Sequence, residues 1–166
     1  MLDLTALPRA GVKGRDLSPW IASSAYSVGD QSNRAYSQHD GSLIVRLSPG
    51  ELLLLANCAA PSHDVMAFSL EATYTCYPVR RQDSHYWFSL SGERCSNMLA
   101  KLCAVDLSVE SFANYAVAQT SVARTGAILV RHDSNDARRY HLLGDSATAQ
   151  YMRSCLGDAM VEFVRR

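Results

Sequence analysis

Three neighbouring residues, Ser62, His63 and Asp64, are of the types that form a hydrolase triad. A triad needs a nucleophile, a base and an orienting carboxylate aligned in space, and consecutive residues point in different directions. The same residue types also start helices, and here they follow Pro61 and precede an apolar run. The sequence therefore predicts a helix at residues 61–73, whose N-terminus explains the triplet without catalysis.

Histidines and cysteines give no metal-ligand pattern. There is no H-x-H, H-E-x-x-H or Cys-x-x-Cys spacing among the five histidines and five cysteines. They are His39, His63, His85, His132, His141, Cys58, Cys76, Cys95, Cys103 and Cys155. We predict surface or packed histidines, reduced and mostly packed thiols, and no metal site in this chain.

Two glycine-containing turns precede predicted helices, at Gly11-Val-Lys-Gly14 and at Ser91-Gly92. Backbone amides at a helix start attract anions, but neither the G-x-x-x-x-G-K-[ST] nor the G-x-G-x-x-G pattern is present. A turn or strand followed by a helix cap is the simpler interpretation. No residue is assigned as catalytic or cofactor-binding.

Arginine pairs and aromatic residues leave two interpretations open. Arg80-Arg81 and Arg138-Arg139 either bind an anionic ligand or acidic partner or are solvated charges at strand ends. Large aromatic residues either anchor an interface or pack in the core; these are Trp20, Tyr74, Tyr77, Tyr86 and Trp87. Core packing and solvated strand ends are the simpler interpretations.

Composition limits the class of protein. The 166 residues are 48% hydrophobic, and 16 basic side chains balance 16 acidic ones. Such a chain buries a substantial core, and its zero net charge gives no general attraction to nucleic acid or to an anionic membrane. With neither a signal-peptide pattern nor an apolar run of about 18 residues, the expected location is the cytoplasm.

Hydrophobic periodicity and turn residues predict an α+β fold with a mainly antiparallel sheet. Helices are predicted at residues 15–23, 61–73, 93–103 and 147–164. Strands are predicted at residues 43–47, 51–56, 74–79, 86–90, 116–123, 127–131 and 139–143. Residues 28–41 are predicted to be a polar loop, and Thr125-Gly126 the turn of the second hairpin.

A weak internal repeat runs through this pattern. Gly14, Ser18, Ala22, Ala35 and Arg46 each have an identical residue 78 positions later; these are Gly92, Ser96, Ala100, Ala113 and Arg124. The two copies share a glycine before a helix and an arginine before an apolar strand. A single domain (residues 1–166) built from two pseudo-repeats, about residues 1–79 and 80–166, is the expected organisation.

The second copy carries a family resemblance. Phe88-Ser-Leu-Ser-Gly-Glu-Arg94 and Met98-Leu-Ala-Lys-Leu-Cys-Ala-Val-Asp-Leu107 resemble the L-S-G opening and leucine-rich helix of the γ subunit of heterotetrameric sarcosine oxidase. The likeness continues through Phe112, Ala118-Gln-Thr120, Ala123-Arg124 and Ile128-Leu-Val-Arg131, and weaker similarity covers the first half. Ala104 departs from the family by replacing its usual proline, and Leu143-Gly-Asp-Ser146 replaces a basic pair.

The resemblance implies duplicated α/β subdomains like those of the folate-binding aminomethyltransferase of the glycine cleavage system (T-protein) and of YgfZ-like proteins. It also implies an accessory γ subunit without catalytic residues, in a complex that oxidatively demethylates sarcosine or a related N-methyl amine. Its partners would be α, β and δ subunits carrying FAD, FMN, NAD, zinc and the tetrahydrofolate site. The alternative is a stand-alone folate-binding or aminomethyltransferase-like protein.

Overall fold

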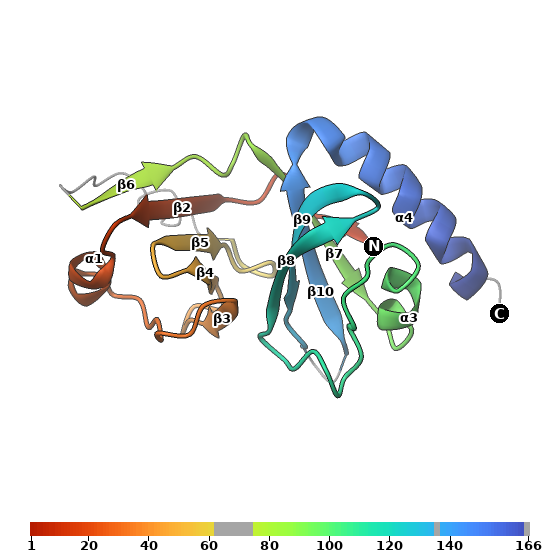
Figure 1. Cartoon of the computed structure of the whole chain (residues 1–166), viewed down its shortest axis with the longest axis horizontal. Coiled ribbons are helices and arrows are strands. Elements are labelled where there is room, and N and C mark those ends of the chain that lie inside the picture. The colour runs from red at the N-terminus through yellow and green to blue at the C-terminus, as the bar shows by residue number, and fades with distance from the viewer. Residues whose placement is uncertain (62–74, 135–136, 165–166) are drawn as a thin grey trace. The chain divides into compact units, whose positions relative to one another are not determined.

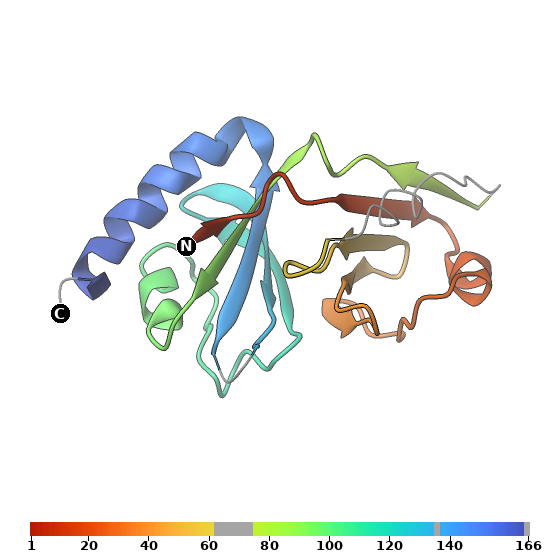
Figure 2. The same ribbon diagram turned by 180° about the vertical axis from the view of Figure 1, so that it is seen from behind.

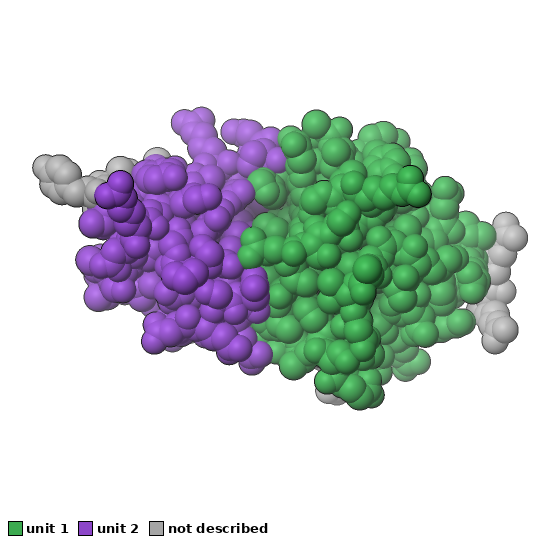
Figure 3. All heavy atoms as spheres, in the orientation of Figure 1, with its two compact units in different colours: residues 1–4, 85–166 green, residues 5–84 purple. Residues whose placement is uncertain are grey.

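The computed structural model describes residues 1–61, 75–134 and 137–164. It divides into two compact units, one formed by residues 1–4 and 85–166 (unit 1) and the other by residues 5–84 (unit 2) (Figure 3). Each contains one five-stranded antiparallel sheet. The chain is therefore an α+β protein with mainly antiparallel sheet, which confirms the predicted fold class.

Unit 2 is built around the strand order β3-β4-β5-β2-β6. Its elements are β2 (Arg9–Gly14), α1 (Ser18–Ser23), β3 (Arg34–Ser37), β4 (Leu43–Ser48), β5 (Glu51–Leu55) and β6 (Cys76–Val79). A core cluster joins the strands to Leu17 and Trp20 of the α1 region. The predicted hairpin at residues 43–47 and 51–56 is present as β4 and β5.

Unit 1 has the strand order β1-β7-β10-β9-β8. Its elements are β1 (Leu2–Asp3), β7 (His85–Ser91), α3 (Cys95–Leu99), β8 (Val117–Val122), β9 (Thr125–Arg131), β10 (Arg139–Asp145), η1 (Ser146–Thr148) and α4 (Ala149–Val164). Helices α3 and α4 lie on one face of this sheet in both views (Figures 1 and 2). The main core of unit 1 lies between them and the sheet, and includes Phe88, Leu129, Leu142 and Leu156.

The two sheets share one connectivity. Without their edge strands β6 and β1, they read β3-β4-β5-β2 and β8-β9-β10-β7. In unit 2, Lys13 of β2 lies opposite Glu51; in unit 1, Ser91 of β7 lies opposite Arg139. Lys13 and Ser91 are 78 residues apart, so the offset of the sequence repeat holds for these first strands.

Beyond the first strand and helix, the offset of 78 is wrong. Arg46 in β4 lies opposite Leu52, the second residue of β5, and its topological counterpart Arg131 in β9 lies opposite Tyr140, the second residue of β10. Arg124, which the sequence repeat matched with Arg46, lies instead between β8 and β9. The longer connection in the second half shifts the correspondence from 78 to 85 residues, which a fixed offset cannot follow.

Two predicted elements differ from the structure. Residues 28–41 are predicted to be a loop because they are polar, but they contain the edge strand β3. This strand pairs with β4, and Ala35 lies opposite Val45. The second hairpin turns at Ala123 and Arg124, with φ values of 47° and 66°, rather than at Thr125-Gly126. Positive φ values at both central residues are typical of the two-residue turn that joins the strands of a hairpin. With the turn at Ala123 and Arg124, the strand β9 begins at Thr125 and includes Gly126.

Helix ends also moved. Helix α1 begins at Ser18 rather than residue 15, because Arg15 still donates its amide to Thr75 O and the Asp16 carboxylate accepts the Ser18 amide. The ordered helix α3 is shorter than residues 93–103 and continues as turns. The predicted helix at residues 61–73, with Ser62, His63 and Asp64, lies outside the described residues.

Candidate functional site

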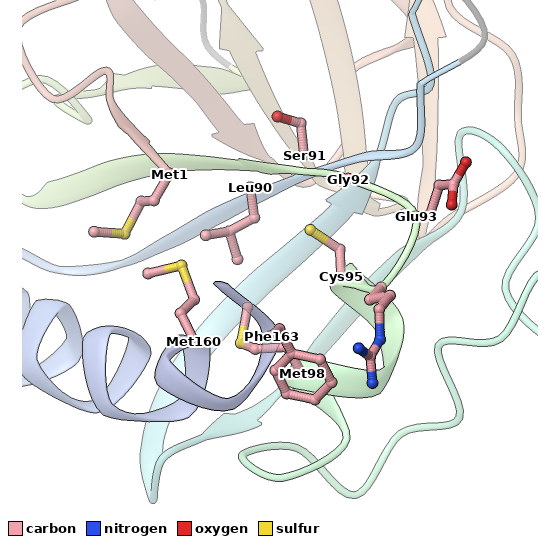
Figure 4. A pocket seen from close by; sticks show the side chains of 10 residues that line it. Met1, Leu90, Ser91, Gly92, Glu93, Cys95, Met98, Met160 and Phe163 are labelled. Atoms are coloured by element: carbon pink, nitrogen blue, oxygen red, sulfur yellow. The ribbon is translucent and has the colours of Figure 1, made fainter. Parts of the chain in front are cut away.

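A cavity of about 300 Å³ opens in unit 1 between the end of β7 and the two helices (Figure 4). Its lining comes from four segments that are distant in sequence: the chain before β1, the end of β7, the start of α3 and the last turns of α4. The lining residues are Met1, Leu90, Ser91, Gly92, Glu93, Arg94, Cys95, Met98, Met160 and Phe163. The tertiary fold creates this pocket.

Local periodicity explains which side chains reach the cavity. Along β7, Phe88 and Leu90 face the helices, because alternate residues of a strand share a face. Cys95 and Met98 lie three residues apart on α3, and Met160 and Phe163 lie three apart on α4, so each pair shares a helix face. In Figure 4 the Glu93 carboxylate points away from the apolar side chains.

The pocket is rich in sulfur and mostly apolar. Met1, Met98 and Met160 contribute thioethers, and Cys95 contributes a thiol. Burial raises the pKa of the Cys95 thiol, so at neutral pH this group is protonated. A neutral buried thiol beside methionines packs as a hydrophobic group, and flexible methionines adapt to the shape of what they contact.

Positive charge borders the apolar lining. The guanidinium carbon of Arg94 lies 4.7 Å from the centre of the Phe163 ring, and Lys101 Nζ lies 5.7 Å from it. Lys101 is also ion-paired with Glu162 at 2.7 Å. Arg94 has no carboxylate partner among the ion pairs of the described residues. The geometry suits an apolar group accompanied by a negative charge.

A second cluster is a row of four rings in unit 1. The ring centroids of Trp87 and His141 are 5.5 Å apart, those of His141 and His132 are 5.8 Å apart, and those of His132 and Tyr115 are 5.6 Å apart. Trp87 Nε1 donates to His141 Nδ1 at 3.0 Å. Because an indole can only donate, His141 Nδ1 is the acceptor and its proton lies on Nε2.

Burial controls the charge of these histidines. His141 is fully buried, and this desolvation, with His132 and Arg139 nearby, lowers its pKa to about 3. Burial and Arg139 also lower the pKa of His132. Both imidazoles are therefore neutral at pH 7, and the buried Nε2 of His141 has no hydrogen-bond partner among the described residues. A base closed off from solvent in this way suits packing better than proton transfer.

The buried Arg131 forms a third cluster in unit 1. Arg131 Nη1 donates to Phe112 O at 2.6 Å, and its Nε and Nη2 form a fork with the Asp133 carboxylate. Burial alone would raise the pKa of Asp133, but the hydrogen bonds from Arg131 and from the Arg139 amide outweigh it and keep this pKa low. The group is an ion pair that fixes a loop.

The glycine and arginine motifs found in the sequence have structural roles in the fold. Gly11 and Gly14 belong to β2, and a Cβ on Gly14 would lie 2.1 Å from Thr75 O, so close strand packing explains this glycine. Arg81 is ion-paired with Glu51, and Arg138 donates to Glu93 O. No group of three or more His, Cys, Asp or Glu among the described residues is placed to hold a metal ion.

Burial decides the interpretation of four of the five large aromatic residues. Trp20, Tyr86 and Trp87 are buried in the core, whereas Tyr77 is 54% exposed; Tyr74 lies outside the described residues. The sequence predicted the helices at residues 93–103 and 147–164 that carry Cys95, Met98, Met160 and Phe163, but it did not reveal the pocket. The missing information was the approach of Met1 and the end of β7 to those helices. No helix among the described residues is long and apolar enough to span a membrane.

Sequence comparison identifies no relative: no protein-family model matches the chain, and no curated protein matches it. Solved structures do match. A chain of heterotetrameric sarcosine oxidase from Corynebacterium sp. U-96, in complex with pyrrole 2-carboxylate, superimposes with a TM-score of 0.80 at 18% identity. The match covers 99% of this chain and 84% of that chain.

The glycine cleavage system aminomethyltransferase T from Bartonella henselae matches with a TM-score of 0.62 at 13% identity. This match covers 93% of the present chain but 44% of the transferase, so the chain spans less than half of that protein. At these identities the similarity concerns the fold. The fold is that of a sarcosine oxidase subunit and of aminomethyltransferase-like proteins.

Proposed function

We propose that this chain is a small accessory subunit, of the γ type, in a flavoenzyme complex related to heterotetrameric sarcosine oxidase. The observation that carries the proposal is the structural match, which covers nearly all of this chain and 84% of a sarcosine oxidase chain. A match over most of both chains indicates subunits of similar size and architecture.

In the proposed complex, larger α and β subunits carry the flavins and NAD, and a δ subunit carries zinc. Together they oxidatively demethylate sarcosine or a related N-methyl amine in the cytoplasm, with tetrahydrofolate as acceptor of the methyl carbon. The present chain contributes shape and contacts. The full burial of His141 supports this division of labour, because this imidazole cannot reach a substrate from solvent.

Co-expression with the flavin-bearing subunits tests the proposal. We expect the chain to co-elute with them in a yellow complex, and native mass spectrometry to give one copy of each subunit with bound flavin. The chain purified alone should be colourless. A chain that remains monomeric beside folded, flavin-loaded α and β subunits would contradict the proposal.

The similarity to aminomethyltransferase T favours one alternative, a folate-binding protein that acts alone. Titration of the isolated chain with 5-formyltetrahydrofolate, followed by calorimetry, separates the two functions. Micromolar binding together with a failure to join the flavoprotein subunits would favour the alternative. We expect no binding at that concentration.

A further inference from the structure

The outer edge of β7 is only partly covered. On its inner side β7 pairs with β10 as far as Ser91 opposite Arg139, and the Gly92 amide donates to Arg138 O. On its outer side the short β1 pairs with Ser89 and Phe88. The outer ladder of the described residues therefore ends two residues before the strand does.

The orientation of Ser91 makes this open edge usable. The backbone N–H and C=O groups of successive strand residues point to alternate edges of the strand. Trp87 O accepts from the Leu4 amide on the outer edge, whereas the Gly92 amide donates to Arg138 O on the inner edge. Ser91 is four residues after Trp87, an even number, so its N–H and C=O also point to the outer edge. Ser91 is exposed, and an added strand would find a donor and an acceptor there.

The pocket lies directly beside this edge. Met1 and Leu90 line it, and the exposed part of the Met1 side chain extends the apolar surface. The volume of about 300 Å³ is at the lower end for ligand pockets, which suits one large apolar side chain better than a cofactor. Methionine walls accommodate several anchor shapes.

The charges beside the pocket favour an acidic partner. Arg94 and Lys101 both lie over Phe163, and Arg138 is held at Glu93 O. Lys101 is ion-paired with Glu162, whereas Arg94 forms no ion pair among the described residues; the Lys101 hydrogen bond and charge, and more weakly the Arg94 charge, lower the pKa of Glu162. A carboxylate on the incoming segment would pair with Arg94 at the apolar boundary, where an ion pair is less screened than in open solvent.

We infer that an extended segment of a partner protein adds to β7 at Ser91, places one large apolar side chain in the pocket, and sets an acidic residue against Arg94. This deepens the proposed function, on which it rests only for the partner's identity. Main-chain hydrogen bonds supply affinity, and the pocket and Arg94 supply specificity.

The probe is a phage-displayed library of random heptapeptides, selected on the whole chain. Enriched peptides should combine a Leu, Ile, Met or Phe anchor with a nearby Asp or Glu. Their binding should weaken about tenfold or more with Met160→Trp, which fills the pocket from its partly exposed rim, and with Arg94→Glu. Bound peptide should also slow hydrogen exchange of the Ser91 amide.

Matched variants separate the pocket from general effects. Val109→Trp adds the same indole at an exposed site of the same unit, and Arg15→Glu makes the same charge change at an exposed arginine of the other unit. Both should bind selected peptides like the unchanged chain. Thermal unfolding of each variant confirms that it is folded before binding is compared.

Three results would overturn the inference. One is the absence of enriched peptides, and another is enriched peptides that bind Met160→Trp and Arg94→Glu unchanged. The third is self-association of the chain that Met160→Trp abolishes, because the occupant would then be a second copy. If peptides bind as expected but the flavin-bearing subunits do not, the proposed function fails and the strand-addition site stands.

Discussion

At the scale of single residues, several buried polar side chains form hydrogen bonds within the core of their own unit. His141, Arg131 and Arg9 are buried, and each donates to or accepts from a neighbour in its own unit. Arg9 donates to four backbone carbonyl oxygens, those of Thr5, Leu7, Arg81 and Gln82. A buried arginine hydrogen-bonded in this way specifies local structure.

His141 predicts a pH-dependent stability. In the unfolded chain an imidazole has a pKa of about 6.5, whereas in the folded chain it is about 3, so the unfolded state binds more protons between these values. The free energy of unfolding should fall as the pH falls through this window. Between pH 6.5 and 5 the His141 share of the loss is about 1–2 kcal/mol.

Urea unfolding at several pH values measures this effect. His141→Gln, which keeps an acceptor for the Trp87 indole, should flatten the pH dependence. His39→Gln removes an exposed imidazole and serves as the control. Equal slopes for the two variants would show that His141 is not the group that titrates. His132, whose pKa is also lowered, contributes in the same direction in all three proteins.

At the scale of elements, one device recurs in both sheets. Arg46 and Arg131 occupy the same register position and each donates to a carbonyl of a preceding loop, Gly29 O at 2.8 Å and Phe112 O at 2.6 Å. Each also has an aspartate, Asp30 at 3.6 Å or Asp133 at 2.7 Å. A buried arginine therefore fixes the loop that leads to the outer strand of each hairpin.

Replacing these arginines should have unequal effects. Arg131→Met removes a fork of hydrogen bonds to Asp133 and leaves Phe112 O without its donor, at a cost of about 2–4 kcal/mol. Arg46→Met should cost less, because Asp30 is fully exposed and its ion pair is weak. Urea unfolding of both variants compares them.

Arg131→Lys is the matched control for charge. Lysine keeps the positive charge but lacks the planar fork, so it should recover only part of the stability lost in Arg131→Met. Full recovery would mean that charge alone matters. Equal losses for Arg46→Met and Arg131→Met would contradict the dependence on partner burial.

At the scale of the whole molecule, one sheet takes an edge strand from the opposite end of the sequence, whereas the other sheet is formed entirely within its own half. Strand β1, at residues 2–3, completes the sheet of residues 85–166, and β6, at residues 76–79, completes the sheet of residues 5–84. The two pseudo-repeats stay a prediction beside the matching strand orders. Their predicted boundary at residue 79 stays a prediction about ancestry, whereas the compact units divide at residue 84.

Deleting residues 2–4 should destabilise unit 1 although they lie more than 80 residues from β7. The deletion removes β1, the bond from the Leu4 amide to Trp87 O, and the ion pair of Asp3 with Arg153. We expect a loss of about 1–3 kcal/mol in the free energy of unfolding.

Asp3→Asn removes only the ion pair, which is partly exposed, and should cost at most about 1 kcal/mol. Urea unfolding followed by tryptophan fluorescence in a Trp20→Phe background reports on Trp87, which lies in the strand that β1 pairs with. A deletion no more harmful than Asp3→Asn would show that strand pairing at β1 contributes nothing.

The sequence by itself determined the fold class and most elements, because alternation, helical spacing and turn residues act over a few neighbours. Periodicity identified the hairpin of β4 and β5, the strand β7 and the long helix α4, and the family-like motifs indicated a sarcosine oxidase subunit fold. It missed β3, whose polar residues need a neighbouring strand to become a sheet edge.

Tertiary structure alone decided which distant segments meet. The pairing of β1 with β7, the equivalence of Arg46 with Arg131, and the pocket of Met1, Leu90, Met98 and Met160 all depend on contacts between residues far apart in sequence. No local pattern encodes such contacts, since strand pairing is fixed by burial of whole faces and by register. Spacing therefore predicted what each segment becomes, and packing decided what the segments build together.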